Sequence, residues 1–345
     1  MKKRFLIWMI LGIFILTLII LTKPFYSFIT NTLHISPLKV LLLPSNVKKT
    51  NNIVNILLLG KAGGTHEGPN LTDSINVVSI NLTTNHITLF SVPRDIWSEP
   101  IEEKVNAAYA IGEAKQPGKG GLKLAKAEIG AVIGQPIHYG AVIEFEKFKE
   151  LIDYFGGIDI DVERSFTDDQ FPIPGKEDDT CSGDPNYKCR YKSLSFTKGH
   201  QHMNGETALN YVRSRHGNNR EGSDFARGKR QQKMIDAVIQ ETISTIKTLD
   251  IKKIEKLYSL YDRIISRDIT NENSAYLLKH FVFHKKPVIK QTAIEQSFFE
   301  IPDVNEYGRF VLIPKNNDYS ILHEYIECLI EGKDKCEDIK AKINE

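Results

Sequence analysis

The feature that most restricts how this chain can fold is an uninterrupted apolar run near its start. Residues 5–22 carry no charge and no proline, and residues 1–4, Met-Lys-Lys-Arg, place three basic side chains directly before them. As a helix, this 18-residue run would reach roughly 27 Å, about the thickness of a thin bilayer core. Because a soluble helix is rarely apolar on every face, residues 5–22 are predicted to cross a membrane.

The charges around this run predict its orientation. Three basic residues precede it and only Lys23 follows closely, so the positive-inside rule places residues 1–4 in the cytoplasm and the remaining chain outside. No convincing cleavage pattern of small residues follows, which favours an uncleaved signal anchor in the cell membrane over a cleaved signal peptide. Residues 23–50, which contain three prolines, are interpreted as a stalk that leads to the extracytoplasmic domain.

The part of the chain beyond this anchor is nearly neutral, which restricts the ligands it can bind. Of the 45 basic side chains four lie in residues 1–23, so 41 remain against 43 acidic ones. A nucleic-acid-binding domain presents a basic surface, and this composition argues against one. Any site for an anion must therefore be local.

Four cysteines form two pairs of the same spacing in polar segments. Cys181 and Cys189 are eight residues apart, and so are Cys328 and Cys336. Four cysteines allow three connectivities, and two short local disulfides are the simplest pairing for a protein outside the cytoplasm. A metal site is the alternative, but no Cys-x-x-Cys spacing supports it.

Short apolar runs alternate with helical patterns along the first half of the chain. Strands are predicted at 55–60, 75–80, 86–92, 137–145 and 158–162, and helices at 104–115, 121–133 and 145–155. This alternation indicates an α/β domain over residues 51–249, with helices on both faces of a sheet. Residues 165–198 are rich in Asp, Pro and Gly and are predicted to be a loop. Residues 250–345 are expected to complete the same domain with helices and one strand near 310–314.

The strongest functional signal is a local excess of arginine. The chain has 33 Lys and 12 Arg, yet residues 213–230 hold five arginines and one lysine. Arginine offers a planar set of donors that grips phosphate or carboxylate oxygens and keeps its proton. On a helix predicted for 224–246, Arg227, Arg230 and Gln231 share one side of the first turns. The others are Arg213, Arg215 and Arg220, of which Arg220, in a glycine-bounded loop, is the weakest candidate.

Three further residues extend this set. Asp73 and Arg94 lie near the ends of predicted strands, where α/β proteins tend to place ligands. Asp224 is the expected N-cap of the helix that carries Arg227 and a potential metal ligand. For any single arginine, a surface ion pair is the commoner role, and the concentration of five is what favours an anion site. His200 and His202 are more simply interpreted as solvated side chains than as metal ligands.

Together these residues resemble the LytR-CpsA-Psr family, whose members attach glycopolymers to bacterial cell walls. The resemblance spans roughly residues 53–245 and rests on several motifs in order. The motifs are Asn55-Ile-Leu-Leu-Leu-Gly60, Leu71-Thr-Asp-Ser74, Ser91-Val-Pro-Arg-Asp95, Val105-Asn-Ala-Ala-Tyr109, Phe155-Gly-Gly-Ile-Asp159, Leu209-Asn-Tyr-Val-Arg-Ser-Arg215 and Asp224-Phe-Ala-Arg-Gly-Lys-Arg-Gln231.

The resemblance implies a mixed sheet sandwiched by helices, with a hydrophobic pocket for a polyprenyl chain. It implies phosphoryl transfer, in which a hydroxyl of a cell-wall glycan attacks the phosphorus nearest the donor glycan and polyprenyl phosphate leaves. Asp73 and Asp224 would hold Mg²⁺ or Mn²⁺ with phosphate oxygens, and Asp73 would help to remove the hydroxyl proton. Positive groups would neutralise the leaving phosphate, as this chemistry requires. The pyrophosphate would be bound by Arg94, Arg213, Arg215, Arg227 and Gln231, and we add Arg230 to this set.

The chain also departs from the family pattern. Ala62 and Leu71 stand where many members have an acidic residue and an arginine, and a basic residue often found after the Pro-Arg-Asp motif is absent near Ser98. Two other functions would use the same residues. One is a pyrophosphatase that cleaves the lipid-linked donor with water, and the other is a non-catalytic regulator of envelope assembly that binds polyprenyl phosphates.

Overall fold

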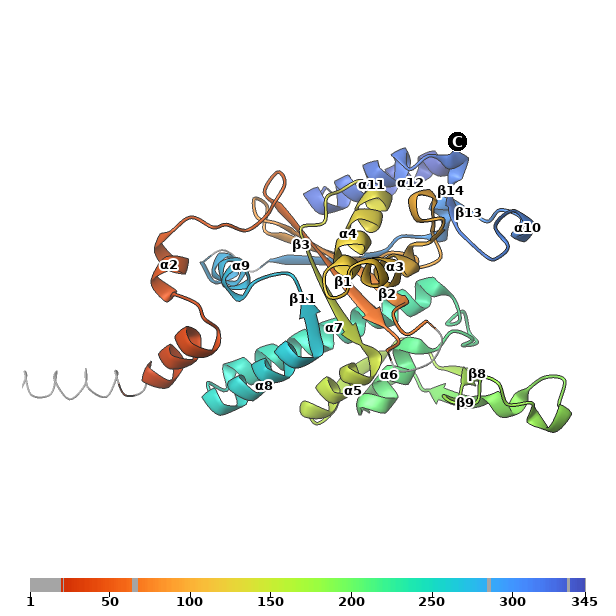
Figure 1. Cartoon of the computed structure of the whole chain (residues 1–345), viewed down its shortest axis with the longest axis horizontal. Coiled ribbons are helices and arrows are strands. Elements are labelled where there is room, and N and C mark those ends of the chain that lie inside the picture. Colours follow the sequence, from red (N-terminus) through yellow and green to blue (C-terminus); the bar gives the residue numbers. More distant parts are fainter. Residues whose placement is uncertain (1–19, 21, 64–67, 284–286, 334–335, 345) are drawn as a thin grey trace, which may run out of the picture.

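A mixed six-stranded sheet forms the centre of the computed structural model, which describes residues 20, 22–63, 68–283, 287–333 and 336–344 (Figure 1). Of Asp224 it describes the backbone alone. The strand order is β11-β6-β1-β2-β3-β12. In chain order these are β1 (Ile53–Lys61), β2 (Thr72–Asn81), β3 (His86–Ser91), β6 (Tyr139–Glu144), β11 (Ile265–Arg267) and β12 (Val288–Ala293).

Neighbouring strands that follow one another along the chain are antiparallel. The chain joins β1 to β2 and β2 to β3 directly, and both pairs are antiparallel. β6 returns parallel to β1 after a helical crossover, as a parallel pairing requires. The two edge strands, β11 and β12, both come from the segment after residue 250, so that segment contributes to the central sheet.

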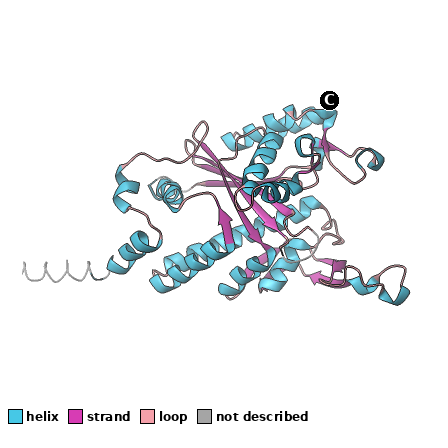
Figure 2. Cartoon of the chain, in the orientation of Figure 1, coloured by secondary structure: helices cyan, strands magenta, loops and turns pink. Residues whose placement is uncertain are grey.

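Helices cover both faces of the sheet (Figure 2). Successive residues of a strand point to opposite faces, so Leu57 packs in one core with Ile129 and Ile326, whereas Val54 packs in another with Tyr276. The first face is covered by α3 (Ala108–Lys115), α4 (Gly120–Ile133), α11 (Ser320–Glu331) and α12 (Cys336–Ala341). The second is covered by α5 (Phe145–Tyr154), α7 (Asp224–Lys247), α8 (Ile251–Ile264) and α9 (Asn271–Phe283).

Two antiparallel ribbons outside the sheet correct two of our expectations. The strand predicted at 158–162 is β7 (Ile158–Val162), but it pairs with β10 (Gly199–Met203) and not with the central sheet. Most of the predicted loop 165–198 is a hairpin of β8 (Phe166–Pro172) and β9 (Tyr191–Phe196). Its strands carry buried Phe166, Phe171 and Phe196 among polar residues. The connection between the strands is rich in Asp, Pro and Gly, and this composition led us to predict a loop for the whole segment.

Both predicted disulfides are confirmed. Cys181 is bonded to Cys189 in the connection between β8 and β9, and Cys328 on α11 is bonded to Cys336 at the start of α12. The first bridge closes the protruding end of the hairpin seen at the lower right of Figure 1.

The remaining elements are short. α6 (Gly205–Arg213) follows β10, and its N-cap is Asn204, as predicted, with the side chain accepting a hydrogen bond from Thr207 N–H. Besides several single-turn 3-10 helices, the others are η1 (Phe28–Thr32), α2 (Pro37–Leu42), β4 (Trp97–Ser98), β5 (Glu103–Lys104), β13 (Phe299–Glu300), α10 (Val304–Tyr307) and β14 (Ile313–Pro314).

The segment expected to be a stalk, residues 23–50, is partly packed against the domain. Ile35, Val40 and Val47 are buried in the cluster that contains Tyr276 and Leu277 of α9. Among the described residues no helix is long and apolar enough to cross a membrane. The predicted anchor, residues 5–22, falls almost wholly outside them.

A histidine beside the first strand makes stability depend on pH. Burial lowers the pKa of His138, and the ammonium groups of Lys126 and Lys48 lower it further. Its Nδ1 accepts a hydrogen bond of 3.0 Å from Asn55 N–H, which requires the neutral ring. A lowered pKa contributes stability that is present above the unfolded value and lost as pH falls through the folded value. We expect His138→Gln to reduce the loss of unfolding free energy below about pH 6.5, measured by urea denaturation of the full chain in detergent.

His202 serves as the matched control, because its pKa is shifted in the opposite direction to that of His138. Hydrogen bonds from His202 to Asp159 Oδ1, at 2.8 Å, and to Gly156 O raise the pKa of His202. Its contribution is complete at low pH and is lost as pH rises through the folded pKa. His202→Gln should therefore steepen the loss of stability on acidification, and equal pH profiles for wild type and His138→Gln would contradict the assignment.

Candidate active site

The first turns of α7 lie against β2 and β3 and bring the predicted ligand-binding residues to the sheet. The Cβ of any residue replacing Gly228 would lie 2.6 Å from Ser91 Oγ, so glycine permits this close approach. Gln231, one turn further, accepts a hydrogen bond of 2.9 Å from Ser74 Oγ. The N-cap is Ser223, whose side chain accepts from Ala226 N–H, which corrects our assignment of that role to the neighbouring Asp224.

An ion-pair network fixes Asp73 and Arg94 at the ends of β2 and β3. Arg94 Nη1 pairs with Asp73 Oδ1, and Arg215 Nη2 lies 3.7 Å from the same oxygen. On its other side, Arg94 Nε is 3.3 Å from Asp95 Oδ2, and Lys104 Nζ is 2.7 Å from Asp95 Oδ1. Asp95 is buried, so it orients the guanidinium of Arg94 toward the site.

A buried carboxylate that our sequence reasoning missed shapes the loop that carries Arg213 and Arg215. Asp168 on β8 is fully buried, and its Oδ2 accepts hydrogen bonds from Ser214 Oγ at 2.6 Å and from Arg215 N–H at 3.1 Å. A third comes from His216 N–H at 3.2 Å. Because it lies in the segment predicted as a loop, only the alternation of buried residues along β8 could have indicated it.

Arg213 is positioned by aromatic rings. Its guanidinium carbon lies 5.3 Å from the ring centre of Phe145 and 5.9 Å from that of Phe171. Such cation–π contacts orient a guanidinium while leaving its edge donors available for oxygen ligands. Arg213 ends α6 and Phe171 belongs to β8, so the hairpin also forms part of the site.

The placement of Arg230 corrects our prediction that it binds the anion. Its guanidinium donates to the carbonyl oxygens of Tyr211 (2.9 Å), Ser214 (2.7 Å) and Glu221 (2.8 Å). It also forms a 2.7 Å ion pair with Glu221 Oε2. Burial lowers its pKa, an effect that the Glu221 carboxylate opposes. With every guanidinium nitrogen engaged internally, Arg230 is a structural residue.

Two polar hollows meet at the remaining predicted residues. One of about 150 Å³ lies toward the β8–β9 hairpin, and one of about 330 Å³ lies toward β12. Asp73, Arg227 and Gln231 line both. Arg213 and Arg215 line the first and Arg94 lines the second, so the structure brings together six predicted residues, whereas Arg220 and Arg230 line a separate hollow.

An apolar cavity begins where these hollows meet. It has a volume of about 310 Å³ and lies between the sheet and the helices α5, α7 and α8. Gln231 lines this cavity as well as both polar hollows. The other lining residues are almost all apolar and include Leu58, Ile143, Phe148, Met234, Ile235, Val238 and Ile239.

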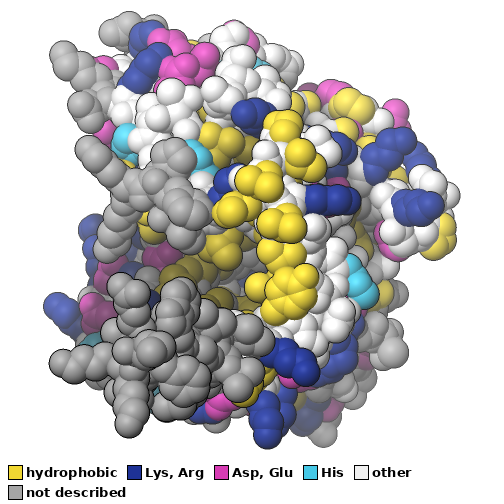
Figure 3. All heavy atoms as spheres, turned by 90° about the vertical axis from the view of Figure 1, so that its left-hand side faces the viewer, with side chains coloured by type: hydrophobic (Ala, Val, Ile, Leu, Met, Phe, Trp, Pro, Cys, Tyr) yellow, Lys and Arg dark blue, Asp and Glu magenta, His cyan; other side chains and the backbone are white. Residues whose placement is uncertain are grey.

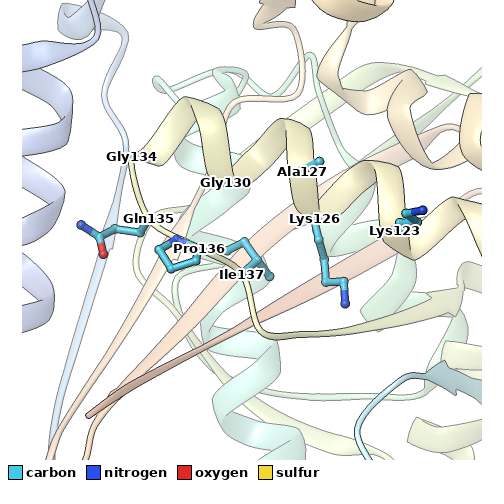
Figure 4. A pocket seen from close by; sticks show the side chains of 8 residues that line it. All are labelled: Lys123, Lys126, Ala127, Gly130, Gly134, Gln135, Pro136 and Ile137. Atoms are coloured by element: carbon cyan, nitrogen blue, oxygen red, sulfur yellow. The ribbon is translucent and has the colours of Figure 1, made fainter. Parts of the chain in front are cut away.

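A larger depression of about 480 Å³ is separate from this site (Figure 4). It lies between α4 and the residues that precede β6, and it is lined by Lys123, Lys126 and Gln135 among others. These residues adjoin the start of β6, whereas the arginine site adjoins its end. Lys126 pairs with Asp268, and none of the predicted site residues lines this depression.

The described residues supply one carboxylate of the predicted metal pair. Asp73 lines both polar hollows, whereas the Asp224 side chain lies outside the description. In the described ranges, the one group of three close metal-ligating side chains is Asp179, Cys181 and Cys189. These two cysteines are joined in a disulfide, so they offer no thiolate to a metal.

Comparisons with a family model, with related sequences and with solved structures agree with the family resemblance seen in the sequence. The LytR_cpsA_psr family model matches residues 33–322. A polyisoprenyl-teichoic acid–peptidoglycan teichoic acid transferase, TagU of Bacillus anthracis, is 31% identical over 256 residues, which are 71% of this chain and 73% of that protein. The crystal structure of B. subtilis TagV covers 82% of this chain and 99% of its own, with 24% identity and a TM-score of 0.56. A structure of TagT bound to LI-WTA covers 83% and 95%, with 17% identity and a TM-score of 0.54.

The separation of roles between Arg230 and Arg215 can be tested by stability. Replacing Arg230 with Met leaves three carbonyls and a carboxylate without their buried partner, so we expect a loss of about 3–5 kcal/mol in unfolding free energy. Arg215→Met removes a guanidinium whose side chain is 39% exposed and should cost less than about 1 kcal/mol. Urea denaturation of the full chain measures both. Similar losses for the two variants would contradict the structural role of Arg230.

Proposed function

This chain belongs to the LytR_cpsA_psr family, and from that premise we propose that it is a membrane-anchored phosphotransferase with its catalytic domain outside the cytoplasm. It moves a glycopolymer from a polyprenyl-pyrophosphate carrier to a hydroxyl of a cell-wall acceptor. The relative from B. anthracis is named for the transfer of teichoic acid from a polyisoprenyl carrier to peptidoglycan. This name supports the class of donor and acceptor.

The observation that carries the proposal is the meeting of two unlike environments at Gln231. The apolar cavity suits a hydrocarbon chain, and the hollows beside it hold four arginines. A ligand that fills both must have an apolar tail joined directly to a multivalent anion. A polyprenyl pyrophosphate has this construction. Its first phosphate is attached to the apolar tail, and its second phosphate carries the glycan on the side away from the tail.

The residues that line the two polar hollows, which together we call the arginine cleft, have different roles in the reaction. The acceptor oxygen forms a bond to the glycan-side phosphorus, and the bond from that phosphorus to the bridging oxygen breaks. Polyprenyl phosphate leaves with the bonding electrons. Asp73, which lies between the two hollows, accepts the hydroxyl proton, and Arg94 and Arg215, both beside Asp73, neutralise the charge that moves onto the leaving phosphate.

A divalent cation fits this donor set as part of the proposal. Mg²⁺ is commonly held by one or two carboxylates together with substrate phosphates, and Asp73 supplies a carboxylate at the junction of the hollows. Asp224 is the second proposed ligand. When bound, Mg²⁺ or Mn²⁺ would add positive charge at the phosphate oxygens.

Transfer assays with matched variants test this function. The full chain is incubated with a polyprenyl-pyrophosphate glycan and a cell-wall glycan acceptor, with and without Mg²⁺. We expect labelled glycan on the acceptor, a loss of roughly 10²–10³ in rate for Arg94→Ala, and a comparable loss for Asp73→Asn. Arg220→Ala, which alters an exposed arginine outside the cleft, should keep wild-type activity.

The same assay distinguishes the alternatives. Release of free phosphorylated glycan in the presence of acceptor would indicate a pyrophosphatase. Tight binding of the donor without any turnover would indicate a regulator and would overturn both enzymatic assignments.

A further inference from the structure

We infer that helix α2 and the lysines around it form a second membrane contact, which rests on an anionic lipid surface and fixes the orientation of the domain. The inference relies on the proposed membrane location, and it concerns a surface that the catalytic proposal does not use.

Helix α2 has one face bound to the domain and one face unoccupied in the part of the chain that is described. Val40 is buried against α9, where Tyr276 Oη donates to Lys39 O at 3.0 Å and Lys279 Nζ donates to Val40 O at 2.7 Å. The leucines around Val40 point away from this contact. Their exposed fractions are 70% for Leu38, 57% for Leu41, 72% for Leu42 and 52% for Leu43.

The N-terminal segment that holds these leucines carries charge of one sign. The first 66 residues of the chain contain no Asp or Glu, whereas Lys39 on α2 and Lys48 and Lys49 shortly after it in sequence are exposed. Figure 3 shows this side of the molecule, where a strip of hydrophobic side chains is flanked by Lys and Arg. An apolar strip bordered by lysines is the pattern of segments that lie in the interface of an anionic bilayer.

The exposed leucines of α2 follow closely after the predicted membrane anchor in the chain, so they are expected to lie near the bilayer. A helix over residues 22–27 leads into η1 and then α2, so the chain reaches this face directly after the predicted anchor. Asn271 Nδ2 donates to Leu33 O and to Tyr258 Oη, which ties the segment before α2 to α8 and α9. In Figure 1 α2, α8 and α9 lie together at the left.

The apolar cavity opens toward the same side. Ile239, which lines the cavity, is 45% exposed, and Ile243 and Ile246 continue the apolar stripe toward the end of α7. Helix α8 begins four residues after α7 ends, and Asn271 connects it to Leu33, four residues before α2. Docking through α2 would therefore turn the outer end of the cavity toward lipid.

A bilayer is a better occupant than a second copy of this chain. A two-fold contact would bring the same lysine-bordered surface of both copies together, and the first 66 residues offer no acid to offset its charge. Anionic headgroups pair with these lysines, and the acyl region accepts the leucines.

Tryptophan quenching in vesicles tests the contact. The full chain is reconstituted in phosphatidylcholine and phosphatidylglycerol vesicles whose acyl chains carry bromine, after Trp8→Phe and Trp97→Phe remove the native tryptophans. We expect the emission of Leu42→Trp to be strongly quenched, and that of Leu38→Trp likewise. The control, Val304→Trp, replaces an apolar side chain that is 53% exposed on α10, at the opposite side of Figure 1, and should remain unquenched.

The outcomes separate docking from anchoring. A chain that keeps Trp8 as its single tryptophan reports the anchor. Quenching of Trp8 without quenching at positions 38 and 42 would overturn the docking and leave the membrane location intact, whereas no quenching at any position would overturn both. A blue-shifted but unquenched emission from Leu42→Trp would show that protein covers α2 and would also overturn the inference. Quenching that weakens in phosphatidylcholine vesicles would support the role of the lysines.

Discussion

The site depends on the hydrogen bonds that the buried guanidinium of Arg230 donates. It joins α7 to the carbonyl oxygens of Tyr211, Ser214 and Glu221, and these residues surround the segment that carries Arg213 and Arg215, which we propose bind the ligand. Removing such a charge from water is costly unless all its donors are satisfied, so the segment has a strong preference for this one arrangement. Asp168 performs the same task from the other side of the loop, through the N–H groups of Arg215 and His216.

Two polar networks thus support a site made of charges that would otherwise repel each other. Arg94 and Arg215 both approach Asp73 Oδ1, and Arg213 is held over aromatic rings. Prearranged cations cost little reorganisation when an anionic ligand enters, which is how electrostatic catalysis gains its effect. The apolar cavity begins at Gln231, one helix turn after Arg227, so α7 lines both the polar hollows and the apolar cavity.

The sequence predicted most of this arrangement because its signals are local. The strands around residues 56, 76 and 88 and the helices α4, α5 and α7 follow from hydrophobic periodicity, and the arginine cluster follows from composition. The hypothesis of a lipid-linked ligand came from the family resemblance, because hydrophobic periodicity and charge alone do not identify a ligand. What failed depends on contacts between distant segments. Helical spacing placed Arg230 beside Gln231, but only the carbonyls of α6 and the following loop decide which way its side chain is directed.

The same limit explains the hairpin and the N-terminal segment. Polar residues between β8 and β9 resemble a loop until strand pairing and the burial of Asp168 are known. Residues 23–50 resemble a linker because apolar and polar side chains are mixed there and three prolines interrupt them. Val40 and Val47 nevertheless pack against α9, which is more than 200 residues away in sequence.

The central claim is that the arginine cleft and the apolar cavity act as one binding site. The most direct measurement compares the affinities of a polyprenyl pyrophosphate and of inorganic pyrophosphate for wild type and for Ile235→Trp, which fills the cavity without touching the arginines. The account predicts that wild type binds the lipid far more tightly than pyrophosphate and that Ile235→Trp loses this advantage while its affinity for pyrophosphate is unchanged. Equal lipid affinities for the two proteins, measured by calorimetry, would contradict it.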